Sequence, residues 1–368
     1  MKELSIILPC QNEEATIGIC IKKIKQVFEN ENINGEVIVS DSSKDNSARI
    51  ARDLGAEVIE HGKDGYGIAC LEGLKKATGK FLVIGDADDT YDFLELPKFL
   101  NALRKGYDFV IGSRIKGDIK KGAMPFSHRY IGNPLLSYLL SLFFKTKVSD
   151  AHCGFRAFRR DILEKLNLCT AGMEFASETI INVAKNKLSI KEIPISYYPR
   201  KGKSKLKSFS DGWRHLRFML MYSPSYLFLA PGIFLFAIGF LVLLLLLRND
   251  FIFLGLNMAQ NHMFLGALFT ILGYQIMSIG LYAKVYAIVS GFEKRDKIVD
   301  FIAKHIPLER GLIIGLTIFA LAFLSCLFIF FSNLGNIRFI LFGLTLLSIG
   351  LQTIFSAFFL SILLVEKK

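Results

Sequence analysis

The sequence predicts an α/β domain followed by an all-α membrane domain of four helices. Strand-like and helix-like segments alternate through the first part of the chain, which is typical of a mostly parallel sheet. Charges then become scarce: residues 1–222 contain 35 Lys and Arg and 27 Asp and Glu, whereas residues 223–368 contain 10 and 6. Four apolar blocks in this second part are each long enough to cross a bilayer. We expect domains at residues 1–199 and 223–368, joined by a basic interfacial helix at 200–222.

Runs of β-branched and aromatic residues predict the strands of the first domain, at residues 4–8, 37–39, 56–59, 81–85, 109–111 and 190–198. Periodic apolar residues predict helices within residues 17–28, 47–54, 63–80, 94–104 and 175–187. Asp45 or Ser43 is placed to cap the helix that begins at Ser47. In such sheets, ligands gather at the carboxyl ends of the strands.

The stretch FLVIGDADDTYDF, at residues 81–93, is the first candidate site. An apolar strand ends there and is followed by Asp86, Asp88, Asp89 and Asp92. Carboxylates this close together raise one another's pKa unless a cation lies among them, so Mg²⁺ or Mn²⁺ is expected, and with it a diphosphate. The alternative is an Asp-rich turn that caps the next helix.

Two segments have the composition of helices that lie on a membrane surface. Residues 124–145 have a polar start and a dense apolar body, which favours an interfacial helix over a span. Residues 198–222 carry seven basic residues against one acid, interleaved with aromatic residues such as Trp213. Such a segment would attract anionic lipid.

The four apolar blocks lie at about residues 224–247, 263–289, 311–331 and 338–365. The loop near residues 291–310 is rich in charge, so the positive-inside rule places it in the cytosol, together with the first domain. Gly266, Gly273 and Gly280, at seven-residue spacing, predict close helix packing, either within the chain or between subunits of a homo-oligomer. Lys284 is expected to extend its amine to the membrane surface.

Composition limits the function classes. The formal net charge of +12 suggests nucleic acid, but no groove-reading or base-stacking motif accompanies it. Anionic lipid and phosphate substrates account for the charge equally well. The six cysteines show no paired or metal-ligand spacing and fit a reducing compartment. The chain begins with a strand-like LSIILP in place of a signal peptide, so we expect the first domain to be cytosolic.

Five motifs in order, LSIILPCQNEE, VIVSDSSKDNS, GDADDTYDF, GSR and DAHCGFRAF, resemble those of family 2 glycosyltransferases with the GT-A fold, a Rossmann-like α/β domain. The basic segment and the four spans resemble the polyprenyl-phosphate branch, the dolichol-phosphate mannose and glucose synthases. The resemblance covers the first 220 residues by motif and the remainder by hydropathy alone. In the second motif, Ser40 and Ser42 replace the usual aspartate and glycine.

The resemblance implies a role for individual residues. Asp86 and Asp88 would hold the metal, with Ala87 between them at the donor. Asp41 would bind the base or ribose of the nucleotide. Arg114 and Arg129 would hold the acceptor phosphate and, with Asp88, form the catalytic set. The remaining donor-binding residues would be Pro9, Gln11, Glu13, Arg200 and Lys205.

Three function classes remain open. The first is an inverting, metal-dependent transfer of a hexose from GDP-mannose or UDP-glucose to dolichyl or undecaprenyl phosphate. Such an acceptor needs no catalytic base, because its phosphate is already anionic near neutral pH. The second is a processive polysaccharide synthase, whose Gln-x-x-Arg-Trp signature is missing. The third is a non-catalytic scaffold or lipid-phosphate translocation component, against which the intact DADD cluster argues.

Structural roles compete with these assignments. Arg114 and Arg129 could be surface arginines paired with Asp108 or Asp118. Arg156 and Asp150 are expected to form an internal ion pair that positions their loop. Glu174 and Glu178 could reach a sugar hydroxyl or form a solvated helix face.

Overall fold

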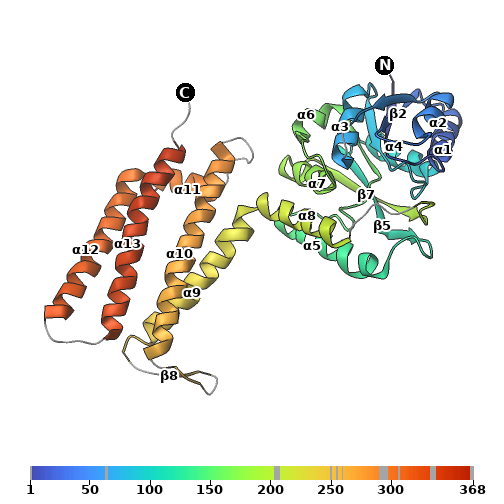
Figure 1. Ribbon diagram of the computed structural model, residues 1–368. Coiled ribbons are helices and arrows are strands. Elements are labelled where there is room, and N and C mark those ends of the chain that lie inside the picture. The colour runs from blue at the N-terminus through green and yellow to red at the C-terminus, as the bar shows by residue number, and fades with distance from the viewer. Residues whose placement is uncertain are drawn as a thin grey trace. The chain divides into compact units, whose positions relative to one another are not determined.

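The computed structural model describes residues 2–62, 65–202, 208–248, 251–253, 256–258, 260–289, 297–305, 307–331 and 337–364. The chain forms two compact units (Figure 1). Unit 1 comprises Met1–Met219 and unit 2 comprises Leu220–Lys368. Lys205 lies outside the described residues, so its predicted role has no structural counterpart here.

Unit 1 is built on a seven-stranded sheet with the strand order β3-β2-β1-β4-β6-β5-β7. The strands are β1 (Leu4–Cys10), β2 (Gly35–Asp41), β3 (Glu57–Glu60), β4 (Phe81–Ile84), β5 (Phe109–Ile119), β6 (Arg156–Arg159) and β7 (Ile190–Tyr197). All pairs are parallel except those of β6, which runs antiparallel to β4 and β5. The predicted α/β class is confirmed. The sheet brings the carboxyl ends of β1, β2 and β4 to one edge.

Strand β5 is longer than the predicted 109–111. It pairs with β7 up to Ser113, its register then shifts, and pairing resumes at Asp118. Gly117 lies in this irregular stretch, where a Cβ atom would come within 1.9 Å of the carbonyl oxygen of Ile195. Glycine therefore lets the two strands approach across the bulge.

The helices of unit 1 are α1 (Ile17–Asn30), α2 (Ser47–Asp53), α3 (Tyr66–Lys76), α4 (Leu96–Arg104), α5 (Asn133–Phe144), α6 (Leu163–Leu166), α7 (Phe175–Lys185) and α8 (Ser208–Met221). The apolar residues of α1 are buried as their periodicity predicts. Of the two cap candidates for α2, Asp45 accepts a hydrogen bond from the Ser47 N–H at 3.0 Å. A π-helical turn, His128–Gly132, leads into α5.

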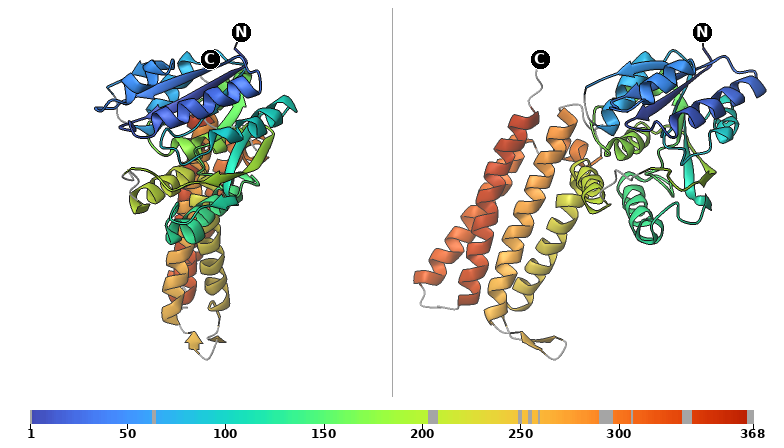
Figure 2. Two further views of the ribbon diagram at one scale, coloured as in Figure 1. Left: turned by 90° about the vertical axis from the view of Figure 1, so that its right-hand side faces the viewer. Right: turned by 45° about the vertical axis from the view of Figure 1, so that its right-hand side comes forward.

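Unit 2 consists mainly of α9 (Ala230–Leu245), α10 (Gln260–Val289), α11 (Lys297–His305), α12 (Leu308–Phe331) and α13 (Ile337–Leu364), with a short ribbon of β8 (Phe251–Phe253) and β9 (Leu256–Met258). In the described part of the chain, four helices are long and apolar enough to cross a membrane: Ser225–Leu245, Asn261–Val289, Leu308–Phe331 and Ile337–Leu364. Helix α9 packs along α10, and α12 packs along α13 (Figure 2). The four predicted blocks match these helices closely.

The glycines of α10 pack against α9 of the same chain. A Cβ atom on Gly273 would lie 2.3 Å from the backbone nitrogen of Phe236, and one on Gly266 would lie 3.0 Å from a Val242 methyl group. The predicted close packing is therefore realised within one chain. Any homo-oligomer would have to use another surface.

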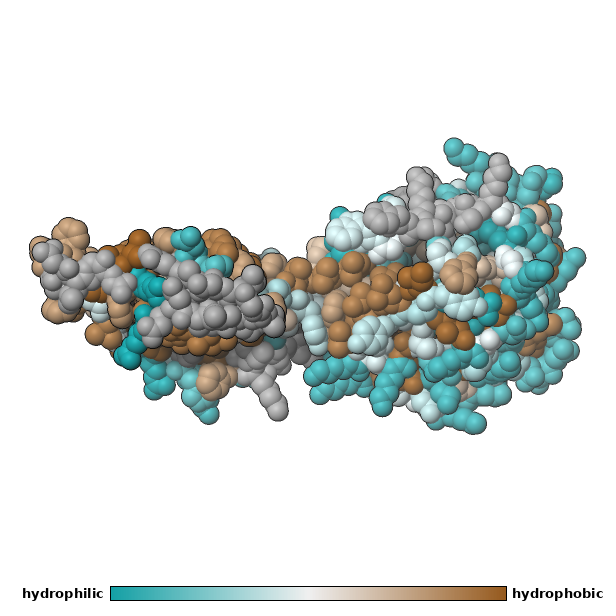
Figure 3. Space-filling model, turned by 90° about the horizontal axis from the view of Figure 1, so that it is seen from below, coloured by the Kyte–Doolittle hydropathy of each residue, from teal (hydrophilic) through white to brown (hydrophobic). Residues whose placement is uncertain are grey.

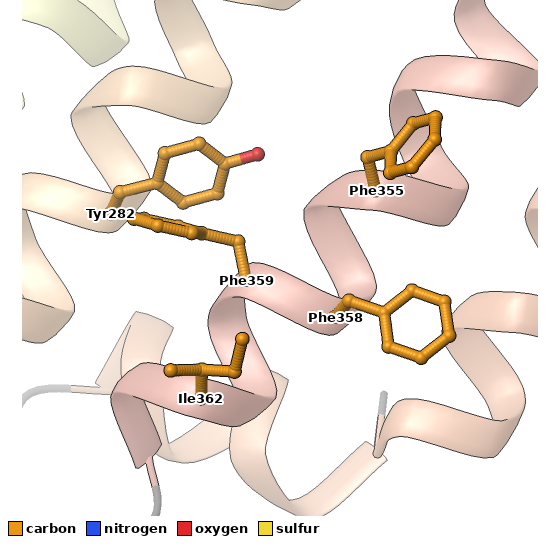
Figure 4. A pocket seen from close by; sticks show the side chains of 5 residues that line it. All are labelled: Tyr282, Phe355, Phe358, Phe359 and Ile362. Carbon is orange, nitrogen blue, oxygen red and sulfur yellow. The ribbon is translucent and has the colours of Figure 1, made fainter.

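Two polar side chains of α10 stand among apolar residues of unit 2. Lys284 is buried and donates a hydrogen bond at 3.1 Å to the hydroxyl of Ser225, the first residue of the first candidate span. The extension of its amine to the membrane surface remains a prediction. Inside an apolar bundle a hydroxyl partner offsets part of the desolvation of the amine. Tyr282 is half-buried and borders an open surface depression of about 440 Å³ whose other lining residues are exposed apolar side chains of α13 (Figure 4).

Candidate functional site

A cavity of about 780 Å³ lies in unit 1 at the carboxyl ends of β1 and β4. It is lined by the segment after β1, the acidic loop after β4, the start of α3, and parts of β5, α7 and α8. Eight of the predicted site residues line it: Pro9, Gln11, Glu13, Asp86, Ala87, Asp88, Arg114 and Arg200. The structure thus brings together residues that are up to 191 positions apart in the sequence.

The four carboxylates of the acidic loop have different roles. Asp86 and Asp88 line the cavity. Asp92 instead caps the short helical turn that follows, accepting from the Leu94 N–H at 3.2 Å. Asp89 has a left-handed backbone, with φ of 58°, and pairs with Lys23 at 2.9 Å. The loop therefore contains both the predicted site and the predicted Asp-rich turn.

Asp86 is the most electrostatically perturbed carboxyl of the cavity. Burial, followed by the negative charge of Asp88, raises its pKa to about 7. The positive charge of Arg200 and a hydrogen bond from Tyr66 oppose this shift only in part. A Cβ atom on Gly154 would lie 2.7 Å from the Asp86 carboxylate, so glycine is needed for the close approach of that loop. A divalent cation would relieve the charge repulsion that raises this pKa.

Arg200 is the counter-charge of the acidic cluster. Its guanidinium donates to Asp88 at 2.7 Å and also pairs with Glu13. The next residue, Lys201, pairs with Asp89 at 2.8 Å. Hydrogen bonds from Lys201 and Lys23 lower the pKa of Asp89, although its burial acts in the opposite direction. The chain after β7 is therefore held at the cavity by ion pairs.

The residues present fit a divalent metal shared with a ligand. Across the described ranges, no three His, Cys, Asp or Glu side chains converge as a complete ligand set. Two neighbouring carboxylates, Asp86 and Asp88, are the protein contribution expected for Mg²⁺ or Mn²⁺, which takes its remaining oxygens from substrate phosphates and water. Such an ion would withdraw charge from a departing diphosphate.

The partner of Arg114 differs from the prediction. Its Nε and Nη2 donate to the two Asp150 oxygens at 2.7 Å each, so neither Asp108 nor Asp118 is its partner. Burial alone would lower the pKa of Arg114, but the charge of Asp150 outweighs it and raises that pKa. This pair uses two of the five guanidinium N–H groups.

Because Asp150 pairs with Arg114, the predicted ion pair between Asp150 and Arg156 is wrong. Arg156 is buried and instead donates to the backbone carbonyls of Cys153, Ala176 and Ala151 at 2.7, 2.7 and 2.9 Å. It organises the loop before β6 as a fixed positive charge without a carboxylate partner.

Two other predicted residues do not line the cavity. Asp41 is buried, and its carboxylate accepts from the Ser43 hydroxyl at 2.6 Å, next to the cavity residue Ser42. Arg129 lies over the ring of Tyr130, at 5.3 Å from its centre. These two roles, base or ribose recognition and acceptor binding, remain predictions.

Of the two glutamates Glu174 and Glu178, Glu178, on α7, has a structural role. It is buried and accepts from the backbone N–H groups and side chains of Cys169 and Thr170, between 2.6 and 3.2 Å. Neither a sugar contact nor a solvated helix face therefore describes Glu178. It fixes the loop that packs against the start of α3.

The sequence analysis did not predict several cavity residues. His128, His152 and His215 line it, as do Tyr66, Tyr91 and Asp211. His152 and His215 lie in contact although they are 63 positions apart, with ring centres 4.4 Å apart. The motif DAHCGFR contained His152, but nothing in the sequence indicated that α8 would reach it.

Family models match both parts of the chain. The model described as glycosyl transferase family 2 matches residues 5–167. The model for the family 2 C-terminal transmembrane region matches residues 281–364. The low-salt glycan biosynthesis hexosyltransferase Agl6 of Haloferax volcanii is 45% identical over 315 residues, covering 85% of this chain and 75% of that protein. The chain belongs to glycosyltransferase family 2. It is thus a membrane-bound glycosyltransferase, as the motifs predicted.

Other relatives of this family 2 glycosyltransferase match just over half of the chain. A dolichyl-phosphate hexose transferase of Haloferax volcanii is 35% identical, over 57% of this chain and 89% of its own. A UDP-N-acetylglucosamine–dolichyl-phosphate N-acetylglucosaminyltransferase of Methanococcus voltae is 32% identical, over 53% and 85%. A structure of glucosyl-3-phosphoglycerate synthase from Mycobacterium tuberculosis with phosphoglyceric acid has a TM-score of 0.50 at 22% identity, covering 60% and 79%. This last likeness concerns the fold alone, and unit 1 has the predicted GT-A fold.

Proposed function

We propose that the protein transfers a hexose from a nucleotide sugar, GDP-mannose or UDP-glucose, to a polyprenyl phosphate such as dolichyl or undecaprenyl phosphate. The reaction takes place at the cytosolic membrane face, uses Mg²⁺ or Mn²⁺ and inverts the anomeric carbon. One observation carries this proposal. Asp86 and Asp88, two carboxylates suited to a divalent metal, line the same cavity as Arg114 and Arg200. The described residues of the chain also include four candidate membrane spans.

The charges of the cavity fit a nucleotide diphosphate. Arg200 pairs with Asp88 and Glu13. A divalent cation held by Asp86 and Asp88 would compete for these carboxylates, and the Arg200 guanidinium would then be able to contact phosphate oxygens. Positive groups aimed at the leaving diphosphate would stabilise the negative charge that develops there in the transition state.

A lipid acceptor fits the surface of unit 1. The turn before α5 and α5 itself expose a set of large apolar side chains: Phe126, Tyr130, Ile131, Leu135, Tyr138 and Leu142. Figure 3 shows hydrophobic residues gathered on a face of unit 1. Met124, Pro125 and Leu136 of the same segment line the cavity. A lipid acceptor held in the membrane would therefore reach the cavity along a surface of apolar side chains. The names of two relatives also include dolichyl phosphate.

A phosphate acceptor simplifies the chemistry required of the protein. The lipid phosphate is already an anionic nucleophile near neutral pH, so no residue needs to remove a proton from it. Its oxygen attacks the anomeric carbon as the bond to the diphosphate breaks, and a single displacement inverts that carbon. The protein then has to align the two substrates and stabilise the leaving group.

The test uses membranes that contain the full chain, a polyprenyl phosphate and radiolabelled nucleotide sugars. GDP-mannose, UDP-glucose and UDP-N-acetylglucosamine are compared with Mg²⁺, with Mn²⁺ and with EDTA. Label that enters the organic phase from one donor, and is lost with EDTA, supports the proposal and names the sugar. If no sugar nucleotide transfers to any polyprenyl phosphate while the protein remains folded, the proposal fails and the translocation role becomes the better explanation.

A further inference from the structure

Three polar side chains from separate elements meet at the wall of the cavity: His152, before β6, Ser177 on α7 and His215 on α8. The Ser177 hydroxyl lies 2.8 Å from His215 Nδ1 and 3.3 Å from His152 Nε2. Because the hydroxyl carries one proton, it donates to only one of these nitrogens and has to accept from the other. The two imidazole tautomers are therefore linked through Ser177.

Burial favours the neutral form of both rings. Burial, followed by the charge of Arg156, lowers the pKa of His215 to about 4. Burial and the neighbouring His215 lower the pKa of His152 well below its ordinary value. A neutral imidazole offers one donor and one acceptor, whereas a phosphate is best bound by cations. This part of the cavity wall is therefore suited to hydroxyl groups.

Two further observations favour hydroxyl groups over a second phosphate. Asp211, one turn before His215 on α8, also lines the cavity and forms a loose ion pair with Arg214 at 3.9 Å. Its carboxylate can still accept from a hydroxyl, whereas it offers no donor to a phosphate. His152 Nδ1 is shielded from water and has no hydrogen-bond partner among the described residues. Since Nδ1 of His215 is engaged by Ser177, its other ring nitrogen is the one left for a ligand.

We propose that His152, His215 and Asp211, positioned by Ser177, bind hydroxyl groups of the sugar carried by the nucleotide and so determine which sugar is accepted. This inference rests on the proposed function, because it assumes a nucleotide sugar in the cavity. It extends the donor site from the predicted diphosphate residues to α8. Helix α8 then has a specificity role in addition to any role at the membrane.

The test measures binding to the purified full chain, so that it does not depend on the acceptor. The ligands are the nucleotide sugar preferred by the wild type, its monodeoxy sugar analogues and the free nucleoside diphosphate, all with Mn²⁺. His215→Asn retains a partner for Ser177 but removes Nε2, and Asp211→Asn is a second variant that preserves shape. His305→Asn, on the exposed end of α11, is the matched control.

In the wild type and the control, at least one deoxy analogue should bind about tenfold more weakly than the parent nucleotide sugar, as expected for one lost hydrogen bond. In His215→Asn or Asp211→Asn this difference should shrink to about twofold, with affinity for the nucleoside diphosphate unchanged. If the wild type binds the diphosphate but discriminates among no deoxy sugars, or if both variants discriminate as the wild type does, the sugar assignment is overturned and the proposed function stands. If the wild type binds no nucleotide at all, both are overturned.

Discussion

Asp88 is the residue whose replacement should most directly abolish catalysis. Asp88→Asn removes one of two metal-type carboxylates while retaining the hydrogen bonds from Thr90. We expect label transfer to fall by about 100-fold or more, because the diphosphate loses its metal-borne charge stabilisation. Asp118→Asn, an exposed carboxylate paired with Lys120, is the control and should transfer normally. Equal transfer by both variants would contradict the metal role.

Asp86 is expected to lower the stability of the folded protein as the pH rises, so its replacement should be stabilising. Its folded-state pKa of about 7 lies above the value of about 3.9 expected in the unfolded chain. The native state therefore binds the proton more tightly, and the stability due to this group is present below about pH 4 and lost as the pH rises through 7.

Consequently, Asp86→Asn should stabilise the metal-free protein at pH 8, on the order of 2–4 kcal/mol, with little effect at pH 4. Thermal unfolding in detergent and EDTA at the two pH values measures this difference. A variant that is less stable than the wild type at pH 8 would show that Asp86 is not strained in the ligand-free cavity.

At the residue scale, motif order predicted most of the charged residues that line the cavity. Asp86, Asp88 and Glu13 lie at strand ends, and a parallel sheet brings such ends to one edge. The partner of Arg114 could not be predicted in the same way, because the choice among Asp108, Asp118 and Asp150 depends on loop packing. Hydrogen bonds between residues 25 and 38 positions apart, as at Ser177, also leave no periodic signal in a sequence.

At the scale of elements, α8 should be sensitive to acid. Its residue His215 is buried. The charges of Arg156, Asp211 and Glu174 affect its pKa, and it interacts electrostatically with the neighbouring ring of His152. The folded-state pKa of about 4 is below the value of about 6.5 expected for an unfolded chain. The stability due to neutral His215 is therefore complete above pH 6.5 and is lost as the pH falls toward 4.

This loss should reach on the order of 2 kcal/mol by pH 5. Hydrogen exchange of α8 at pH 7 and pH 5, corrected for the intrinsic exchange rate, would follow the local opening. His215→Gln cannot titrate and should show a smaller change between the two pH values. An α8 that is equally protected at both pH values in the wild type would contradict the prediction.

Periodicity predicted the types of the elements correctly, but it did not predict the direction or the length of the strands. The antiparallel direction of β6 could not be predicted, because a strand of four residues carries no directional signal. Strand β5 extends to Ile119 because β7 pairs with it beyond the register shift. The part of β5 after Ser113 contains Lys116 and Asp118, whose charges obscure a strand pattern.

For the whole molecule, the proposed topology is testable by cysteine labelling. Lys121→Cys places a thiol on an exposed loop of unit 1, and Asn257→Cys places one on β9, between the first two spans. The exposed Cys169 is replaced by Ser in both. With four spans and a cytosolic unit 1, an impermeant maleimide applied to intact cells should label Asn257→Cys alone.

After permeabilisation, both positions should be labelled. Labelling of Lys121→Cys in intact cells, with Asn257→Cys protected, would place unit 1 on the outside. A unit 1 outside the cell would not meet cytosolic nucleotide sugars, and the proposed donors would then be ruled out. Catalytic transfer in isolated membranes would remain a separate observation.

The attachment of Arg200 and Lys201 to the acidic loop has a practical consequence. Both side chains are partly open to solvent, at 24% and 54% exposure. Ion pairs of this kind weaken as dissolved ions shorten the Debye length from about 8 Å at 0.15 M to about 3 Å at 1 M. The ionic strength of the buffer therefore sets how often Arg200 and Lys201 separate from Asp88 and Asp89. Donor affinities measured at different salt concentrations would report on different starting states of the protein.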